Sequence, residues 1–175
     1  VSNDAVNVNI PKYVVFEGEK YKVTSISLRA FTNCESLRSV SIPSSITRIE
    51  ETFNHCELLT SVTLSEGLTE IESNAFHDCR SLVSISIPSS VTFIGSNAFN
   101  GCNLMDIYIR CQNPPEMYGK AYNYYNDFGG HVLIDPSFSE QTFNNATLHV
   151  PKGLKATYAY DKDWGSFVHI EEMSE

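Results

Sequence analysis

Phenylalanine and cysteine recur along this chain at nearly equal intervals, and this recurrence limits what the chain can fold into. The phenylalanines are Phe31, Phe53, Phe76 and Phe99, and the cysteines are Cys34, Cys56, Cys79 and Cys102. Both series advance by 22, 23 and 23 residues. A fixed period of this length indicates a repeat architecture in which each unit is one supersecondary motif. We therefore expect these residues to form two columns inside a stacked core.

Each unit also carries a short stretch in which apolar and small polar residues alternate. The stretches cover residues 39–42, 61–64 and 84–87. Period two puts Val, Ile and Leu on one side of a strand and Ser and Thr on the other. One such strand cannot bury its apolar side alone, so we expect parallel strands stacked at about 4.8 Å. Pro43 and Pro88 end two of the strands, because proline cannot donate to a ladder.

The order of residues within a unit resembles a known consensus. Residues 82–102 match Leu-x-x-Ile-x-Ile-Pro-x-x-Val-x-x-Ile-Gly-x-x-Ala-Phe-x-x-Cys at each specified position. Ser65 and Glu72 depart from it where Pro and Gly are usual, and residues 37–56 form a shorter unit that lacks the Ala. The pattern is similar to the BspA-like subfamily of leucine-rich repeats, known from bacterial surface or secreted proteins of the Bacteroides type. Residues 147–170 resemble the usual closing segment of that family.

The resemblance implies a mainly β fold with short turns and helix. It implies a right-handed leucine-rich-repeat solenoid with parallel strands, a β N-terminal cap and a strand–helix C-terminal cap. A chain of 175 residues suits one domain over residues 1–175. We divide it into an N-terminal β segment (1–22), repeats of 22–23 residues (23–111), an aromatic insertion (112–145) and the C-terminal cap (146–175).

Both ends of a solenoid expose apolar edges and therefore need caps. At the start, residues 6–10 and 13–16 are typical of strands, and residues 17–19 suit the turn of a hairpin. At the other end we expect a last strand over 148–150 and a helix over about 151–160, with proline at its first turn. Three apolar residues are then expected to cover the last open unit: Trp164, Phe167 and Ile170. A ligand-binding role for the tryptophan is the alternative.

The charge balance excludes two classes of partner. Lys and Arg number 12 against 21 Asp and Glu, so the formal net charge is −9. Nucleic acids and anionic membrane faces both require clustered basic residues. The sequence has no run of about 18 apolar residues that could span a membrane. Residues 1–20 lack the apolar segment of a signal peptide, and the start at Val1 suggests a mature or trimmed piece of a longer product.

No motif in the sequence indicates catalysis, a cofactor or a metal. The histidines show no His-Glu-x-x-His spacing, and no Gly-x-Ser-x-Gly elbow or Gly-rich phosphate loop occurs. No Cys-x-x-Cys pair occurs either, which argues against zinc. His55 and His77 precede repeat cysteines in turn positions, so the repeat register explains them. We expect a protein that is not an enzyme and has neither cofactor nor metal site.

The aromatic insertion is the first candidate for recognition. Its rings stand among Asn and Gly, and tyrosine gives a large contact area at low entropic cost. Loops carried on a rigid scaffold also tend to carry function. The candidate rings are Tyr118, Tyr122, Tyr124 and Tyr125. The alternative is that these rings pack over the last repeat.

The outward side of the strands is the second candidate. Most of its residues are Ser or Thr, which a solvated sheet also requires, and only Asp106, Tyr108 and Arg110 are chemically varied. These three lie next in sequence to the insertion. We therefore expect one binding surface at the junction of the two candidates.

The resemblance implies adhesion, because this family is associated with secreted or surface proteins of anaerobic bacteria that contact host matrix proteins or other cells. We therefore expect a non-catalytic, monomeric binding module at the cell surface or secreted, with a protein or glycan ligand. A carbohydrate-binding module, whose tyrosines stack on sugar rings, is one alternative. A structural spacer that presents another domain is the other. Fold alone does not separate them.

The cysteine column leads to a first prediction. Side chains in a parallel stack point the same way, which makes disulfide geometry hard to reach even where Cα atoms are close. A buried free cysteine behaves as a small hydrophobic residue. Denatured, non-reduced protein is therefore expected to expose five reactive thiols, four from the column and Cys111 outside it. Thiol titration in denaturant measures the number, and a single reactive thiol would mean two disulfides.

Overall fold

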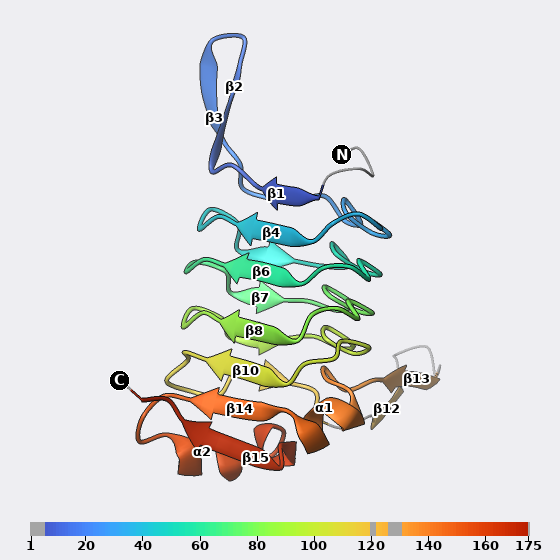
Figure 1. Ribbon diagram of the computed structural model, residues 1–175, viewed down its shortest axis with the longest axis vertical. Helices are drawn as coiled ribbons and strands as arrows, with labels where there is room; N and C mark the ends of the chain where they lie inside the picture. Colours follow the sequence, from blue (N-terminus) through green and yellow to red (C-terminus); the bar gives the residue numbers. More distant parts are fainter. Residues whose placement is uncertain (1–5, 120–121, 126–130, 175) are drawn as a thin grey trace.

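Parallel strands stacked along one axis form the body of the protein. The structure, a computed structural model, describes residues 6–119, 122–125 and 131–174. One face carries, in order along the axis, β1 (Asn7–Asn9), β4 (Ser39–Ile42), β6 (Ser61–Leu64), β8 (Ser84–Ile87), β10 (Asp106–Ile109), β14 (Thr147–Val150) and β15 (His169–Glu172) (Figure 1). They pair in parallel as β1-β4-β6 and as β8-β10-β14-β15. The predicted leucine-rich-repeat solenoid is confirmed.

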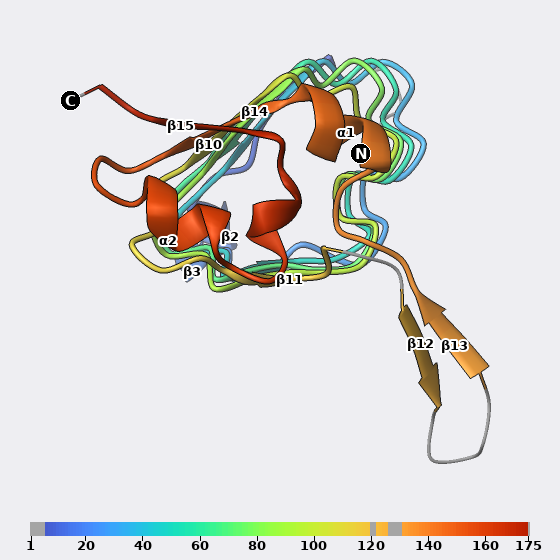
Figure 2. The same cartoon turned by 90° about the horizontal axis from the view of Figure 1, so that it is seen from below.

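A second, narrower sheet lies across the core from these strands (Figure 2). It consists of the parallel two-residue strands β5 (Arg48–Ile49), β7 (Glu70–Ile71), β9 (Phe93–Ile94) and β11 (Glu116–Met117). Alternation decides which residues of the wide face point inward, since Val40 and Ile42 of β4 are buried while their serine neighbours are partly exposed. Each coil of the chain therefore contributes apolar residues to one continuous core.

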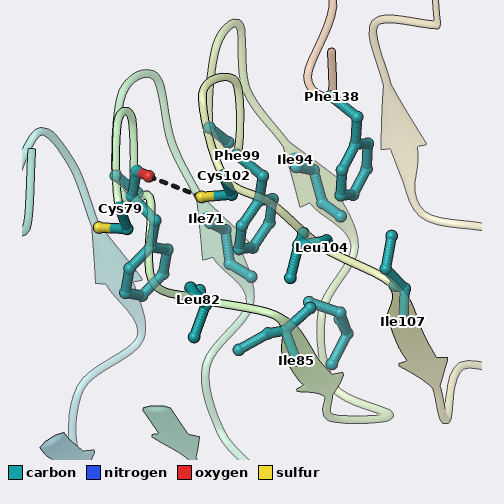
Figure 3. Close-up of a cluster of buried hydrophobic side chains, with 14 of the residues drawn as sticks. Ile71, Cys79, Leu82, Ile85, Ile94, Phe99, Cys102, Leu104, Ile107 and Phe138 are labelled. Carbon is teal, nitrogen blue, oxygen red and sulfur yellow. Dashed lines mark hydrogen bonds between the residues drawn. The ribbon is translucent and has the colours of Figure 1, made fainter. Parts of the chain in front are cut away.

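The predicted phenylalanine column forms the centre of one side of that core. Neighbouring rings stack nearly parallel, with centroids 5.2–5.4 Å apart from Phe31 through Phe53, Phe76 and Phe99. This spacing follows from the strand separation of about 4.8 Å, because each unit repeats the path of the one before. Phe138 extends the column beyond Phe99 at 5.2 Å (Figure 3). The rings of Phe53, Phe76, Phe99 and Phe138 are fully buried.

Thiols of the cysteine column link one unit to the next. After Cys34, each thiol donates a hydrogen bond to the carbonyl oxygen of the phenylalanine in the preceding unit, as the dashed line from Cys102 shows (Figure 3). The pairs are Cys56 with Phe31 at 3.0 Å, Cys79 with Phe53 at 3.2 Å and Cys102 with Phe76 at 3.1 Å. Burial raises the pKa of Cys56 to about 12, so the thiol keeps the proton that it donates. The structure describes all five cysteines of the chain, and they are buried and free.

The repeating path continues beyond residue 111, where the sequence predicts the start of the aromatic insertion. Met117 is buried in β11, which pairs with β9, and Phe138 takes the next place in the phenylalanine column. The described residues leave the repeating path only between Met117 and Phe138. The antiparallel hairpin of β12 (Tyr122–Tyr125) and β13 (His131–Ile134) lies between these two positions. The consensus fails here because this hairpin separates two core positions that are close together in the other units.

The N-terminal hairpin forms as predicted but does not cover the core. It consists of β2 (Tyr13–Phe16) and β3 (Glu19–Lys22) and extends away from the stack (Figure 1). Val15 and Phe16 are 72% and 64% exposed. The two strands pair with each other and with no strand of the stack. The end of the core is closed by β1 and by Ile10, whose amide donates to the oxygen of Ser41 at 3.1 Å.

Helix α2 is shorter than the sequence suggests. It covers Lys155–Ala159, whereas the sequence predicts a helix that begins at Pro151. Gly153 has φ +81°, which a right-handed helix does not admit, so residues 151–154 form a turn closed by Leu154 N–H to Pro151 O at 3.0 Å. The remaining helical elements are α1 (Glu140–Asn145) and η1 (Trp164–Ser166). Among the described residues no helix is long and apolar enough to cross a membrane.

Aromatic rings of the C-terminal cap close the other end of the core. Trp164 is fully buried and donates from Nε1 to the oxygen of Pro115 at 2.7 Å. Its ring and that of Phe167 pack edge-to-face on Phe138, with centroids 6.1 and 5.5 Å away. Ile170 in β15 is also buried. These contacts account for the tryptophan as a core residue and leave no exposed ring surface for a ligand.

Removal of one ring from the phenylalanine column is expected to destabilise the fold strongly. Phe76 lies between two stacked neighbours, so Phe76→Ala leaves a cavity and is expected to lower the free energy of unfolding by about 3–5 kcal/mol. Phe16→Ala on the exposed hairpin is the matched control and is expected to cost less than about 0.5 kcal/mol. Urea denaturation measures both. Equal losses in the two variants would contradict the column as the centre of stability.

Candidate functional site

The outward side of the wide strand face changes character along the stack. In β4, β6 and β8 the outward residues are Ser39, Ser41, Ser61, Thr63, Ser84 and Ser86. In β10 and β14 they become Asp106, Tyr108, Thr147 and His149. We call Asp106, Tyr108, Arg110 and His149 the polar strand patch. It stands where small hydroxyl groups give way to larger and chemically varied side chains.

Register between β10 and β14 brings three of these residues into contact. Tyr108 pairs directly with His149, and their rings stack at 4.4 Å with an interplanar angle of 9°. His149 Nε2 lies 2.8 Å from Asp106 Oδ1, the outward residue two positions earlier in β10. The His149 side chain is 17% exposed and that of Asp106 is 45% exposed. The histidine therefore holds the tyrosine ring and the carboxylate in defined positions.

His149 was absent from the residues that the sequence predicts for the site. The sequence indicated only that His149 points outward from the last predicted strand. Contact with Tyr108 and Asp106 depends on β14 pairing with β10, and the hairpin of β12 and β13 separates these strands in sequence. Only the folded register makes the three residues neighbours.

Arg110 lies at the edge of the patch beside a shallow depression. Its Nε donates to Ser86 Oγ at 3.3 Å. The depression has a volume of about 370 Å³ and is also lined by Thr63 and Glu66. Slight burial acts to raise the pKa of Glu66, but hydrogen bonds from Ser89 and Ser90 outweigh it and hold that pKa below its usual value. Arg110 and the Glu66 carboxylate thus line the same depression at one side of the patch.

Tyr118 lies in a different part of the molecule. Its ring packs edge-to-face on Phe93 of β9 with centroids 6.0 Å apart. The two rings line a groove of about 450 Å³ between the narrow sheet and the C-terminal cap. Pro115, Asp161 and Asp163 line the same groove. It combines aromatic surface with carboxylates.

The predicted junction between the strand face and the aromatic insertion does not form. The backbone of Tyr122, Tyr124 and Tyr125 lies in β12, and the hairpin projects from the corner of the coil away from β10 (Figure 2). The chain crosses to the narrow sheet at β11 before the hairpin begins, so residues adjacent in sequence end on opposite sides of the core. The side chains of these three tyrosines lie outside the part of the structure that is described.

Comparison with protein families identifies the repeat. The family described as BspA type leucine rich repeat region, in six copies, matches residues 9–126. The match ends within the segment that the sequence predicts as a separate insertion. No enzyme family is indicated, and no curated protein matches the chain.

Solved structures of leucine-rich repeat proteins are similar to this chain, and two of them come from Bacteroides species. A leucine-rich repeat protein from Bacteroides ovatus is 30% identical with a TM-score of 0.55, and the match covers 60% of this chain and 30% of that one. A leucine-rich repeat protein from Bacteroides capillosus is 34% identical with a TM-score of 0.55, over 61% of this chain and 78% of that one. This chain therefore spans under a third of the length of the first relative.

Coupling between Tyr108 and His149 is expected to be measurable. Stacked aromatic pairs contribute about 0.5–1.5 kcal/mol beyond the area that they bury. A double-mutant cycle of Tyr108→Ala and His149→Ala is expected to show a coupling free energy of that size in urea denaturation. Tyr108→Ala with Thr63→Ala, two strands away, is the control pair and is expected to be additive within about 0.5 kcal/mol. Additivity in both pairs would mean that the stack does not hold the patch.

Proposed function

This chain belongs to the BspA-type leucine-rich repeat family, and we propose that it is a non-catalytic, protein-binding module of a bacterial cell-surface or secreted protein. Repeats of this kind form binding scaffolds, because the stacked strands offer an extended and rigid surface. The family also includes bacterial surface proteins. The partner proposed here is a host matrix protein or a protein on a neighbouring cell.

The ordered polar strand patch is the observation that carries this proposal. Tyrosine and arginine dominate the binding energy of many interfaces, and a ring that is already held in place loses little entropy on binding. Tyr108 is held by its stack on His149, and the Asp106 carboxylate is held by the same histidine. Arg110 stands beside them at the end of the strand. The patch thus offers an aromatic anchor with charges of both signs around it.

The groove at Tyr118 supports a second candidate, a carbohydrate-binding module. Sugar rings stack on aromatic side chains, and carboxylates accept hydrogen bonds from their hydroxyl groups. Phe93, Tyr118, Asp161 and Asp163 provide both kinds of group within one groove. The tyrosines of β12 belong to this candidate as further stacking residues.

Binding to immobilised host matrix proteins and to whole bacterial cells tests the two candidates and the spacer alternative. The full chain is expected to bind, and Tyr108→Ala is expected to weaken binding by at least about tenfold, as loss of a central anchor does. Tyr160→Ala is the matched control, because Tyr160 is 90% exposed on the C-terminal cap and lies outside the patch. Surface plasmon resonance measures affinity, and circular dichroism confirms that both variants fold.

Three results would overturn the proposal. No binding to any matrix protein or cell would leave the chain a structural spacer. Equal loss in Tyr108→Ala and Tyr160→Ala would remove the patch from the interface. Binding on a glycan array that Tyr118→Ala abolishes and Tyr108→Ala does not change would favour the carbohydrate-binding module instead.

A further inference from the structure

Two histidines and an aspartate meet on the edge of the solenoid where the Phe-x-x-Cys turns lie. His55 belongs to the turn before β6, and His77 and Asp78 belong to the next turn, before β8. One ligand atom from each lies within 4.8 Å of the other two. Asp78 Oδ2 is 3.3 Å from His55 Nδ1 and 3.7 Å from His77 Nδ1. The cluster is separate from the polar strand patch.

Backbone hydrogen bonds between successive turns hold the three residues in register. His55 N–H donates to His77 O at 2.8 Å, and Asp78 N–H donates to Asn100 O at 2.9 Å. His55 and Asp78 have φ of +57° and +55°, and Asn33 has +58° at the same place of the preceding unit. This conformation is thus a property of the repeat. It stacks the side chains of His55 and Asp78 in one column.

The carboxylate of Asp78 uses its two oxygens differently. Oδ2 faces both histidines, whereas Oδ1 accepts from Arg80 Nε at 3.4 Å. Gly101 in the next unit makes room for this arrangement, because a Cβ atom there would collide with Oδ1. Arg80 therefore orients the carboxylate and leaves the oxygen between the histidines for a cation.

We propose that His55, His77 and Asp78 form a binding site for a divalent transition metal of the zinc type. Zinc takes imidazole nitrogen and carboxylate oxygen at about 2.0–2.2 Å, which puts two ligand atoms of a tetrahedron about 3.3–3.5 Å apart. The observed 3.3 and 3.7 Å approach that separation. Calcium and magnesium prefer all-oxygen sites, so two imidazoles select against them. Three protein ligands leave the fourth position for water or for a side chain of a partner.

The surroundings of the cluster suit a cation that arrives from solvent. The side chains of His55 and His77 are 42% and 27% exposed. His55 also lines a shallow depression of about 540 Å³ together with Glu35 and Glu57. Glu57 pairs with Arg80 at 3.5 Å, and the Glu35 carboxylate raises the local cation concentration. Asn54 Oδ1 lies 3.3 Å from His77 Nδ1 and fixes the ring in the free protein. A bound metal would replace that contact.

The arrangement differs from the sequence-based expectation that the chain has no metal site. Its ligands come from two units, so they lie 22 and 23 residues apart and match no short metal-binding motif. Equivalent turn positions in the flanking units hold Thr32 with Asn33 and Asn100 with Gly101. These side chains supply neither imidazole nor carboxylate, so the donor set is confined to the two central turns.

Titration of the full chain with Zn²⁺ tests the proposal after treatment with a chelator and dialysis. Isothermal titration calorimetry is expected to show one Zn²⁺ per chain. His55→Asn and His77→Asn are each expected to weaken binding by at least about tenfold, as loss of a metal ligand or its support does. Both variants should fold, because Asn occupies the same turn positions in the neighbouring units, at Asn33 and at Asn54 and Asn100. His169→Asn, which changes an exposed histidine on β15, is the matched control and is expected to bind as the unchanged chain does.

Cobalt spectroscopy identifies the ligands. Co²⁺ is expected to give visible bands without thiolate charge transfer, because the five cysteines are buried and free of metal-ligand spacing. The absence of stoichiometric Zn²⁺ binding would overturn the proposal. Unchanged affinity in both His55→Asn and His77→Asn, or a thiolate–cobalt band, would also overturn it. Should one variant fail to fold, the other decides, since each removes a different ligand.

Discussion

Hydrogen bonds between the backbones of successive units are the interaction on which this structure depends. On the wide face they form the parallel ladder, and on the turn edge they join residues such as His55 and His77 directly. They set one spacing of about 4.8 Å for everything that the units carry. The phenylalanine rings stack because of that spacing, and the thiol of Cys102 reaches the carbonyl oxygen of Phe76 for the same reason. Burial of the apolar column then stabilises the ladder that aligned it.

The same spacing produces the surface chemistry. A residue on one unit lies directly beside its counterpart on the next, so two unremarkable side chains become a pair when they occupy equivalent positions. Tyr108 and His149 form a stacked pair in this way, and His55 Nδ1 comes within 3.3 Å of Asp78 Oδ2. Residues that lie one repeat period apart in sequence therefore become neighbours on the surface of a rigid repeat protein. Neither of these two sites needs a loop to close over it. The polar strand patch lies on the wide face and the histidine cluster on the turn edge, and the two share no residue.

Much of the fold followed from the repeat, and the departures have physical causes. The strands, the buried phenylalanines and the cysteine column lie where period two and the 22- to 23-residue interval put them. The sequence pattern of the repeat is interrupted after Cys111, because a hairpin separates Met117 from Phe138. Both residues still occupy core positions of the repeat. The start of α2 was misplaced because the left-handed backbone of Gly153 overrides the preference of proline for a first helical turn.

By itself the sequence determined the stacking architecture, the identity of the core residues and the outward position of Asp106, Tyr108 and Arg110, because each follows from local alternation within a unit. The tertiary structure alone decided which outward residues meet. His149 reaches Tyr108 only through the pairing of β14 with β10. Strand β12 lies away from both because the chain first passes around the core to β11 in the narrow sheet. Periodicity determines where a side chain points within its own unit. Its neighbours depend on which units pack side by side. An inserted hairpin changes which residues become neighbours, and the alternation within each unit does not reveal that change.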